Sequence, residues 1–259
     1  MSIIVNGIEY DGMVDLYAGL GGSGTVRGGW ATPFRDRGWK SVITIDIEAK
    51  FNPTIVEDML NVTAADIIKA NGGKIPIVVC ASPPCTSFSI AGCRYHWDAA
   101  TGQPKSANGI LGQKLLRHTL KLMADLKPLY WWMENPRGLM RKQPEVQNLT
   151  RTTVAYCQYG EKTKKPTDLW GVWPTTWKPR AMCKSDPRYT GTMIDANTGE
   201  EWTIDAQGNK CHQTARRGTW HSGVQSMRGN ALRSVIPYEL SDEIAEAVEQ
   251  AISTLHPQL

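Results

Sequence analysis

The chain has 259 residues, of which 41% are hydrophobic and 21% charged, a composition too apolar for a disordered protein and sufficient for one large domain. It has no apolar run near the ~20 residues of a membrane span and no basic and apolar leader, so we expect a cytoplasmic protein. Residues 101–240 carry 21 basic and 11 acidic side chains, which favours a polyanionic partner such as nucleic acid over a merely solvated surface.

The first part of the chain predicts an adenosine-binding unit. Met13–Tyr17 has the apolar pattern of a buried strand and leads into the glycine-rich turn Gly19–Gly24. A second strand is predicted over Ser41–Ile45, and Asp46 follows it. Glycines let the backbone approach a ligand, and an acid at this spacing suits ribose hydroxyls. The pattern does not define which adenosine compound binds.

The stretch Ile77–Gly92, IVVCASPPCTSFSIAG, predicts a strand that delivers a reactive group. Its apolar, β-branched beginning is typical of a buried parallel strand, and Pro83 and Pro84 forbid its continuation as helix or ladder. Cys85 follows at the carboxyl end of the strand, where ligands bind in open α/β sheets. The alternative is a small, buried, unreactive cysteine.

A later strand is predicted to deliver a carboxyl group to the same edge. Leu129–Met133 is apolar and leads into Glu134, Asn135 and Pro136. A glutamate in a packed core needs a partner, and the alternative is an exposed loop acid. Two last strands are predicted over Thr152–Cys157 and Asp168–Val172, as a hairpin around the basic loop Gly160–Pro166.

Three helices are predicted by their apolar spacing. The first covers Ala64–Ala70 with Thr63 as its N-cap, and the last covers Pro237–Ile252 with an acidic outer face. The core residues of the last helix are predicted to be Leu240, Ile244, Ala247, Val248 and Ile252. The middle helix covers Ile110–Leu126, with an apolar side formed by Leu111, Leu115, Leu122 and Leu126. The preceding residues, 95–109, predict a mobile loop over the site.

Residues 173–228 are rich in Trp, Pro, Gly, Arg and Lys and show no helical period, apart from a short hairpin turn predicted near residues 203–210. The sequence therefore predicts an α/β fold with a Rossmann-like, doubly wound, mostly parallel sheet. Its expected divisions are a catalytic domain over 1–172, a small irregular recognition region over 173–226, and a segment over 227–259 that returns to the catalytic domain.

Four stretches resemble motifs of the cytosine-C5 DNA methyltransferase family. DLYAGLGGSG is similar to its first motif, SPPCTSFSIAG to its cysteine motif, WMENP to its Glu-Asn motif and MRGNALRSVIPYEL to its last motif. Their order and spacing agree over about residues 12–172 and 226–252. The resemblance implies the class I methyltransferase fold, S-adenosylmethionine as cofactor and a place in the cytoplasm of a bacterial or phage-infected cell.

The resemblance also implies a role for each matching residue. Cys85 would add to C6 of a cytosine flipped out of duplex DNA, while Glu134, helped by Asn135, would bond its N3 edge and stabilise the enamine whose C5 takes the methyl. Tyr17 matches the ring-stacking aromatic, Asp46 would hold the ribose and Asp58 the adenine edge. The residues expected to bind the cofactor are Tyr17, Gly19, Gly21, Gly22, Asp46, Asp58 and Asn230. Those expected to contact the substrate are Ser82, Pro84, Lys164, Arg216 and Arg217.

Three positions depart from the family pattern. Thr86 stands where the family has Gln, and Glu-Asn-Pro replaces the commoner Glu-Asn-Val. TKKPT replaces a Gln-x-Arg-x-Arg pattern, so Lys165, or failing that Lys164, takes the arginine's role without its planar fork. The recognition region is also short, which leaves RNA or a free cytosine nucleotide open as substrates. A catalytically silent DNA-binding decoy is a further alternative, and a nicotinamide-dependent oxidoreductase is the weakest one.

The six cysteines favour reduced thiols. A zinc ion bound by Cys183, Cys211, His212 and His221 would brace the irregular region, but their spacing fits no standard finger and no CxxC is present. Unrelated residues are therefore the favoured interpretation. We expect a monomer that binds duplex DNA and needs no obligate protein partner.

Overall fold

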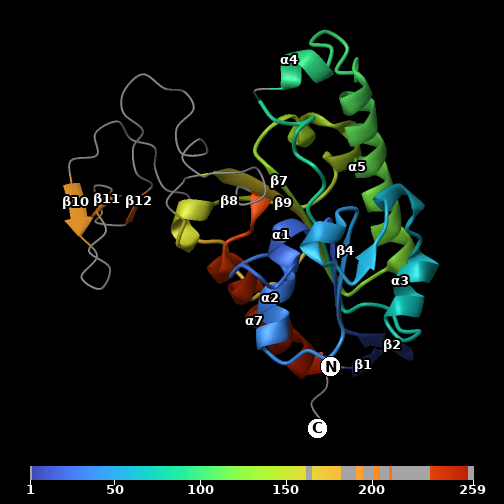
Figure 1. The fold of residues 1–259 in the computed structure, drawn as a ribbon. Helices are drawn as coiled ribbons and strands as arrows, with labels where there is room; N and C mark the ends of the chain where they lie inside the picture. The colour runs from blue at the N-terminus through green and yellow to red at the C-terminus, as the bar shows by residue number, and fades with distance from the viewer. Residues whose placement is uncertain are drawn as a thin grey trace.

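The computed structural model describes residues 2–90, 92–161, 165–181, 191–194, 201–204, 210–211 and 234–255, and its centre is a seven-stranded sheet (Figure 1). The strands are β3 (Met13–Leu16), β4 (Val42–Asp46), β5 (Ile55–Val56), β6 (Val78–Ala81), β7 (Tyr130–Pro136), β8 (Arg151–Ala155) and β9 (Pro166–Val172). Their order across the sheet is β5-β4-β3-β6-β7-β9-β8.

The strand directions define the fold class. From β5 to β7 neighbouring strands are parallel, whereas β9 runs antiparallel to both β7 and β8. The predicted α/β fold with a doubly wound, mostly parallel sheet is therefore confirmed. The direction of winding reverses between β3 and β6, and such a switch point places a ligand crevice at the carboxyl ends of these two strands.

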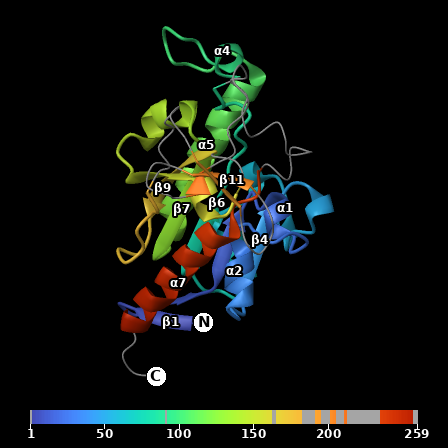
Figure 2. The same ribbon diagram turned by 90° about the vertical axis from the view of Figure 1, so that its left-hand side faces the viewer.

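Helices cover both faces of the sheet (Figures 1 and 2). The α-helices are α1 (Gly19–Gly22), α2 (Ala31–Asp36), α3 (Ala64–Ala70), α4 (Cys93–His96), α5 (Ala107–Leu126) and α7 (Tyr238–Leu255). Short 3-10 helices are η1 (Ala49–Phe51), η2 (Met59–Asn61), η3 (Leu139–Lys142), η4 (Pro144–Val146) and η5 (Tyr156–Tyr159).

Side chains alternate along the strands and build a separate core on each face. Val78 and Cys80 of β6 join the core under α2 and α7, whereas Val79 and Ala81 join the core under α3 and α5. Burial on both faces explains why the parallel strands are continuously apolar in sequence.

Helix α7 confirms the prediction for the C-terminal part of the chain. All five of its predicted core residues are buried. Arg37, at the end of α2, pairs with Asp242 at 2.9 Å and with Glu249 at 3.0 Å, and the indole of Trp39 donates to Glu249 at 2.8 Å. Arg37 and Trp39, directly after α2, thus bind part of the acidic outer face of α7.

Helix α5 begins earlier than predicted, because Ser106 caps it by accepting a hydrogen bond from the Gly109 amide at 3.1 Å. The prediction for Leu111 was wrong, since this side chain is 46% exposed. The neighbouring Gly112 faces inward instead: a Cβ there would lie 2.1 Å from the Ser87 hydroxyl oxygen. Close packing of the helix against the residues after β6 therefore turns Leu111 outward.

The segment predicted as a loop over 95–109 is partly structured. It contains the end of α4, and Trp97 is buried with its indole donating to the Ser87 carbonyl at 2.6 Å. Trp97 also packs against Phe88 with ring centroids 5.4 Å apart. Buried aromatic contacts hold this segment to the residues that follow β6, and Figures 1 and 2 show α4 at the far end of α5.

The predicted helix α3 with Thr63 as its N-cap is confirmed, and Thr63 forms a capping box with Asp66. The hairpin of β1 (Ser2–Val5) and β2 (Ile8–Asp11) was not predicted.

Inside the region predicted to be irregular, the backbone forms an antiparallel sheet of β10 (Gly191–Ile194), β11 (Glu201–Ile204) and β12 (Lys210–Cys211), which confirms the predicted hairpin turn. Among the residues described, no helix combines the length and apolar character that crossing a membrane requires.

Candidate active site

Four predicted site residues follow one aligned row of the parallel sheet. Leu16 of β3 pairs in register with Ile45 of β4 and with Ala81 of β6, and Ala81 pairs with Met133 of β7. The residues directly after this row are Asp46, Tyr17, Ser82 and Glu134. Because the strands are parallel, these residues lie at the same carboxyl edge of the sheet, next to the switch point.

The glycine turn after β3 is tied to the acid that ends β4. The Asp46 carboxylate accepts hydrogen bonds from the Gly19 amide at 2.8 Å and from the Glu48 amide at 2.9 Å. Tyr17 and Gly19 both have left-handed backbones, with φ of 60° and 50°. Asp46 therefore stabilises a turn in which the left-handed backbone of Tyr17, a residue with a Cβ, is costly, whereas glycine adopts that conformation readily.

The three predicted cofactor glycines differ in their surroundings. A Cβ on Gly19 would meet no heavy atom within 4 Å, so its backbone faces open space. A Cβ on Gly21 would lie 2.8 Å from the Gly29 Cα, and one on Gly22 would lie 2.4 Å from the Ala18 Cβ. Gly21 and Gly22 are thus required by packing inside the protein, and Gly19 alone of the three has open space where a Cβ would lie.

Tyr17 and Asp58 lie near each other beside this turn. The Tyr17 hydroxyl shares a 2.9 Å hydrogen bond with Thr119 of α5, and burial raises the pKa of Tyr17, with a further rise from the charge of Asp58. The Asp58 carboxylate accepts from the Leu60 amide at 3.0 Å. Ile47, directly after Asp46, is 63% exposed. Acids, an open glycine backbone and an exposed aliphatic side chain together suit a ligand with hydroxyls and a flat apolar ring.

Cys85 lies on a rigid corner after β6. The Ser82 amide donates to the Leu16 carbonyl at 3.1 Å, and the Ser82 hydroxyl accepts from the Trp30 indole at 3.1 Å. Pro84 is exposed, Cys85 is half-buried, and the Cys85 carbonyl accepts from the Phe88 amide at 3.1 Å. The thiol is not in a disulfide. This corner places Cys85 at the switch-point edge.

The corner is joined directly to the end of β7. Asn135 is 1% exposed, and its Nδ2 donates to the Pro83 carbonyl at 2.9 Å. The Asn135 Oδ1 is buried, with no hydrogen-bond partner among the residues that the structure describes. Asn135 thus ties Glu134 to the segment that carries Cys85.

Glu134 is buried at 4% exposure and is surrounded by polar groups. The Tyr156 hydroxyl donates to its Oε1 at 2.9 Å. Burial raises the pKa of Glu134, while the Lys165 charge and the Tyr156 hydrogen bond oppose that rise and the Asp168 charge adds to it. The net direction favours a carboxyl group that keeps its proton at higher pH than an ordinary glutamate.

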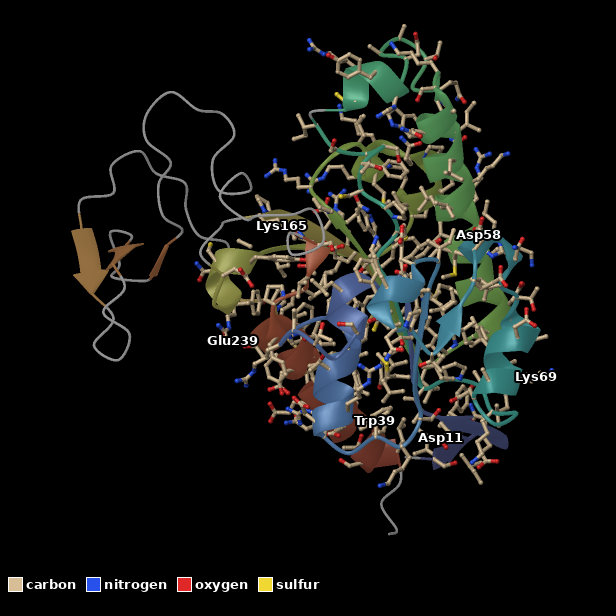
Figure 3. The ribbon with its side chains drawn as sticks, viewed as in Figure 1. Asp11, Trp39, Asp58, Lys69, Lys165 and Glu239 are labelled. Carbon is tan, nitrogen blue, oxygen red and sulfur yellow. The ribbon has the colours of Figure 1, made fainter. Side chains whose placement is uncertain are left out.

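Lys165 lies at the start of β9, on the same side as Glu134. Its Nζ is 4.4 Å from the centroid of the Tyr156 ring, and its φ is 28°. Figure 3 labels Lys165 beside the strands at this end of the sheet. The Lys165 charge is therefore close enough to Glu134 to lower the pKa of that carboxyl.

Several predicted residues lie outside the described ranges. These are Lys164, Arg216, Arg217 and Asn230, and also Cys183, His212 and His221 of the zinc hypothesis, for which Cys211 is described only by its backbone. Within the part of the chain that is described, no group of three or more His, Cys, Asp or Glu side chains forms a metal site.

The contact of Tyr156 with Glu134 and the Arg141–Asp168 pair were not predicted. Asp168 is fully buried beside Asn135 in the β7–β9 register, and Arg141 binds its carboxylate from η3 with the Nε at 2.9 Å. Tyr156 was assigned to a strand, whereas it begins η5. No local signal in the sequence marks either contact, because the partners are distant along the chain.

The fold and this edge define an α/β protein with an adenosine-type turn, a cysteine and a buried glutamate at one switch point. Residues 12–158 match the family described as C-5 cytosine-specific DNA methylase. The chain belongs to this family, which confirms the resemblance seen in its motifs.

Individual relatives match in part. A type II methyltransferase, M.XorII of Xanthomonas oryzae pv. oryzae, is 28% identical over 138 residues, which are 49% of this chain and 28% of the relative. A crystal structure of a DNA modification methyltransferase encoded within a prophage of E. coli is 18% identical with a TM-score of 0.46, covering 81% of this chain and 62% of that one. The methyltransferase EhMeth of Entamoeba histolytica is 12% identical with a TM-score of 0.46, covering 68% and 58%. The chain therefore spans less than two thirds of these relatives.

Proposed function

We propose that this chain transfers a methyl group from S-adenosylmethionine to carbon C5 of cytosine in duplex DNA. The observation that carries the proposal is the aligned row that brings Tyr17, Asp46 and Glu134 to one edge, with the Asn135–Pro83 hydrogen bond linking Glu134 to the corner of Cys85. Membership of the C-5 cytosine-specific DNA methylase family supports both the reaction and the substrate.

The residues around β3 and β4 suit the cofactor. S-adenosylmethionine supplies an electrophilic methyl group when it is bound. Gly19 offers an open backbone, Asp46 and Asp58 offer carboxylates for hydroxyl and amino groups, and Ile47 offers an apolar surface for the adenine. Gly21 and Gly22 would act indirectly, by allowing the turn to pack.

Cys85 and Glu134 divide the chemistry on the base. The Cys85 thiolate forms a bond to C6, the electron pair of the C5–C6 double bond shifts toward N3, and N3 takes the proton of the Glu134 carboxyl. C5 of the resulting enamine would take the methyl from the sulfonium of bound S-adenosylmethionine, whose carbon–sulfur bond would break to leave a neutral thioether. A base then removes the C5 proton, the thiolate leaves C6 as the double bond re-forms, and N3 returns its proton to Glu134.

The buried position of Glu134 supports this role. Burial raises its pKa above that of an ordinary glutamate, so the carboxyl keeps its proton to higher pH, which suits a general acid. Asn135, Lys165, Ser82 and Pro84 complete the proposed site around the base. Lys165 would stabilise the carboxylate that forms once the proton has left.

The basic part of the chain, residues 101–240 with 21 basic side chains, would hold the DNA backbone. Flipping one cytosine costs a few kcal/mol, which phosphate and pocket contacts offset. Residues 173–226, with Lys164, Arg216 and Arg217, are proposed to read the target between a catalytic part over 1–172 and a returning segment over 227–259. We propose that the chain acts as a monomer without an obligate protein partner.

The experiment is transfer of labelled methyl groups by the purified chain to duplex DNA, tRNA and dCMP in parallel. We expect label in duplex DNA, and bisulfite sequencing of DNA from expressing cells then gives the target site. Label in tRNA or dCMP alone would replace the DNA substrate with the other one. DNA binding without transfer to any of the three would indicate a silent decoy.

A further inference from the structure

Tyr156 is a buried phenol whose hydroxyl points at the carboxyl group that the proposed reaction uses. Its side chain is 1% exposed, and its hydroxyl donates to the Glu134 Oε1 at 2.9 Å. A tyrosine hydroxyl buried to this extent is placed for the bond that it makes, because an unmade one costs about 1–3 kcal/mol. The bond joins η5 to the end of β7 across 22 positions of sequence.

Two neighbours hold Tyr156 in this position. Thr167 of β9 places its hydroxyl against that of Tyr156 and donates to the Lys165 carbonyl at 3.1 Å. The Lys165 ammonium lies 4.4 Å from the ring centroid, which is a cation–π distance. The phenol is therefore fixed from its edge and from its face.

We propose that Tyr156 is a positioning residue for Glu134, one that binds Oε1 and so reserves Oε2 for the proton delivered to N3 of the base. The inference rests on the proposed function. Tyr156 keeps its own proton throughout, since the proton that moves to N3 and returns belongs to Glu134. The phenol thereby supplies one uncharged hydrogen-bond donor to Glu134. The neighbouring Lys165 lacks the planar, two-donor fork that an arginine would present to a carboxylate.

Two properties suit a phenol to this task. Burial and the neighbouring Glu134 charge raise the pKa of Tyr156 well above its ordinary value, so the hydroxyl stays a donor at any working pH. A donor to one carboxyl oxygen also fixes the plane of the group. General acids must lie within hydrogen-bond reach of the accepting atom, and fixed geometry supplies much of their effect.

The groups that face Glu134 set the direction of the test. From η5 comes the Tyr156 hydroxyl, from the start of β9 the Lys165 ammonium, and from β9 the Asp168 carboxylate, itself bound by Arg141. The Glu161 charge also acts on Lys165 and on Tyr156. Removing the phenol hydroxyl removes a bond that favours the charged carboxylate, so the pKa of Glu134 rises further.

The test is Tyr156→Phe, measured by kcat, by KM for S-adenosylmethionine and by the pH dependence of kcat. We expect kcat to fall by about tenfold to a hundredfold with KM little changed, because one contributor to general acid catalysis is lost. A reaction that needs protonated Glu134 declines as pH rises through its pKa. The alkaline limb of the profile should therefore move to higher pH, even though the rate falls.

A matched control and a second variant separate positioning from folding. Tyr159→Phe removes another phenol of η5, one that accepts from the Arg180 amide at 2.8 Å instead of contacting Glu134, and it should keep the wild-type limb. 3-Fluorotyrosine at position 156 is a stronger donor of nearly the same shape and should move the limb to lower pH. The inference would be overturned if Tyr156→Phe kept the wild-type kcat and the wild-type alkaline limb of its pH profile. It would also be overturned if Tyr156→Phe and Tyr159→Phe moved that limb by the same amount.

A direct readout distinguishes this inference from the proposed function. The infrared carboxyl band that is lost in Glu134→Gln reports the protonation of Glu134 without any substrate. If wild type methylates nothing, the proposed function fails, and the band still decides whether Tyr156 controls Glu134. Titration of that band to higher pH in Tyr156→Phe supports the contact, and an unchanged titration refutes it.

Discussion

The Asn135 side chain donates a 2.9 Å hydrogen bond to the Pro83 carbonyl, and the two residues lie on different strand ends, 52 positions apart. Asn135 directly follows Glu134, and Pro83 lies two residues before Cys85. Since Asn135 is 1% exposed, water cannot replace the bond if it is lost. Beyond the pairing of β6 with β7, this amide is thus a direct link between the segments that carry the two proposed reacting groups.

Asn135→Ala should lower the free energy of unfolding by about 1–3 kcal/mol, because a buried carbonyl loses its donor. Methyl transfer should fall more than stability alone explains, since the Cys85 corner is no longer tied to β7. Urea denaturation and methyl-transfer assays measure the two effects. Asn61→Ala is the control, because its exposed amide donates only to Glu57 and should change stability by less than about 0.5 kcal/mol. Full activity in Asn135→Ala would contradict this account.

Cys85→Ser should lower methyl transfer by more than about a thousandfold, because a serine hydroxyl ionises far less readily than a thiol and is a weaker nucleophile. DNA containing 5-fluorocytosine should form a denaturation-resistant adduct with wild type, since fluorine cannot leave C5 as a proton does. Cys93→Ser, at the beginning of α4, removes a second half-buried thiol and should form the adduct normally. Equal adduct yields in the two variants would exclude Cys85 as the nucleophile.

Gly19→Ala and Gly21→Ala should fail in different ways. At Gly19 the methyl group meets open space, and the φ of 50° costs about 1–2 kcal/mol, so the protein folds while S-adenosylmethionine binding weakens. At Gly21 the methyl group would lie 2.8 Å from backbone, so the loss should fall on stability and exceed about 2 kcal/mol. Thermal unfolding and cofactor titration distinguish these results, and the reverse pattern would contradict the assignment of the open face.

Asp15 predicts a pH dependence of stability. It lies in β3 with 1% exposure, and its Oδ1 has no hydrogen-bond partner within the described part of the chain. Burial raises its pKa to about 8. The Arg35 charge and the Ala31 amide oppose this rise, and the Asp46 charge adds to it. A carboxyl whose pKa is raised on folding contributes stability at low pH that is lost as pH rises toward the folded value.

The unfolding free energy of wild type relative to Asp15→Asn should therefore fall by up to a few kcal/mol between about pH 4 and pH 8. Urea denaturation of both proteins across this range measures the difference, and any constant offset between them does not matter. A difference that stays level with pH would show that Asp15 is charged at little cost in the folded protein.

Much of the site could be predicted from local sequence. Apolar runs that end at Asp46, at the two prolines before Cys85 and at Glu134 mark strand ends, and parallel strands bring such ends to one edge whatever the rest of the fold does. The capping of α3 by Thr63 and the buried face of α7 follow from side chains within a few positions of each other.

Only the tertiary structure decided which groups touch within that edge. Leu111 turns outward because Gly112 packs on Ser87, and Tyr156 reaches Glu134 because η5 ends the strand predicted through Cys157. The same holds for Gly19, whose open backbone differs from the packed Gly21 and Gly22 although all three are glycines in one motif. Apolar periodicity and the residues that end a strand are properties of neighbours along the chain. These contacts depend instead on how separate elements pack together, which no local sequence pattern predicts.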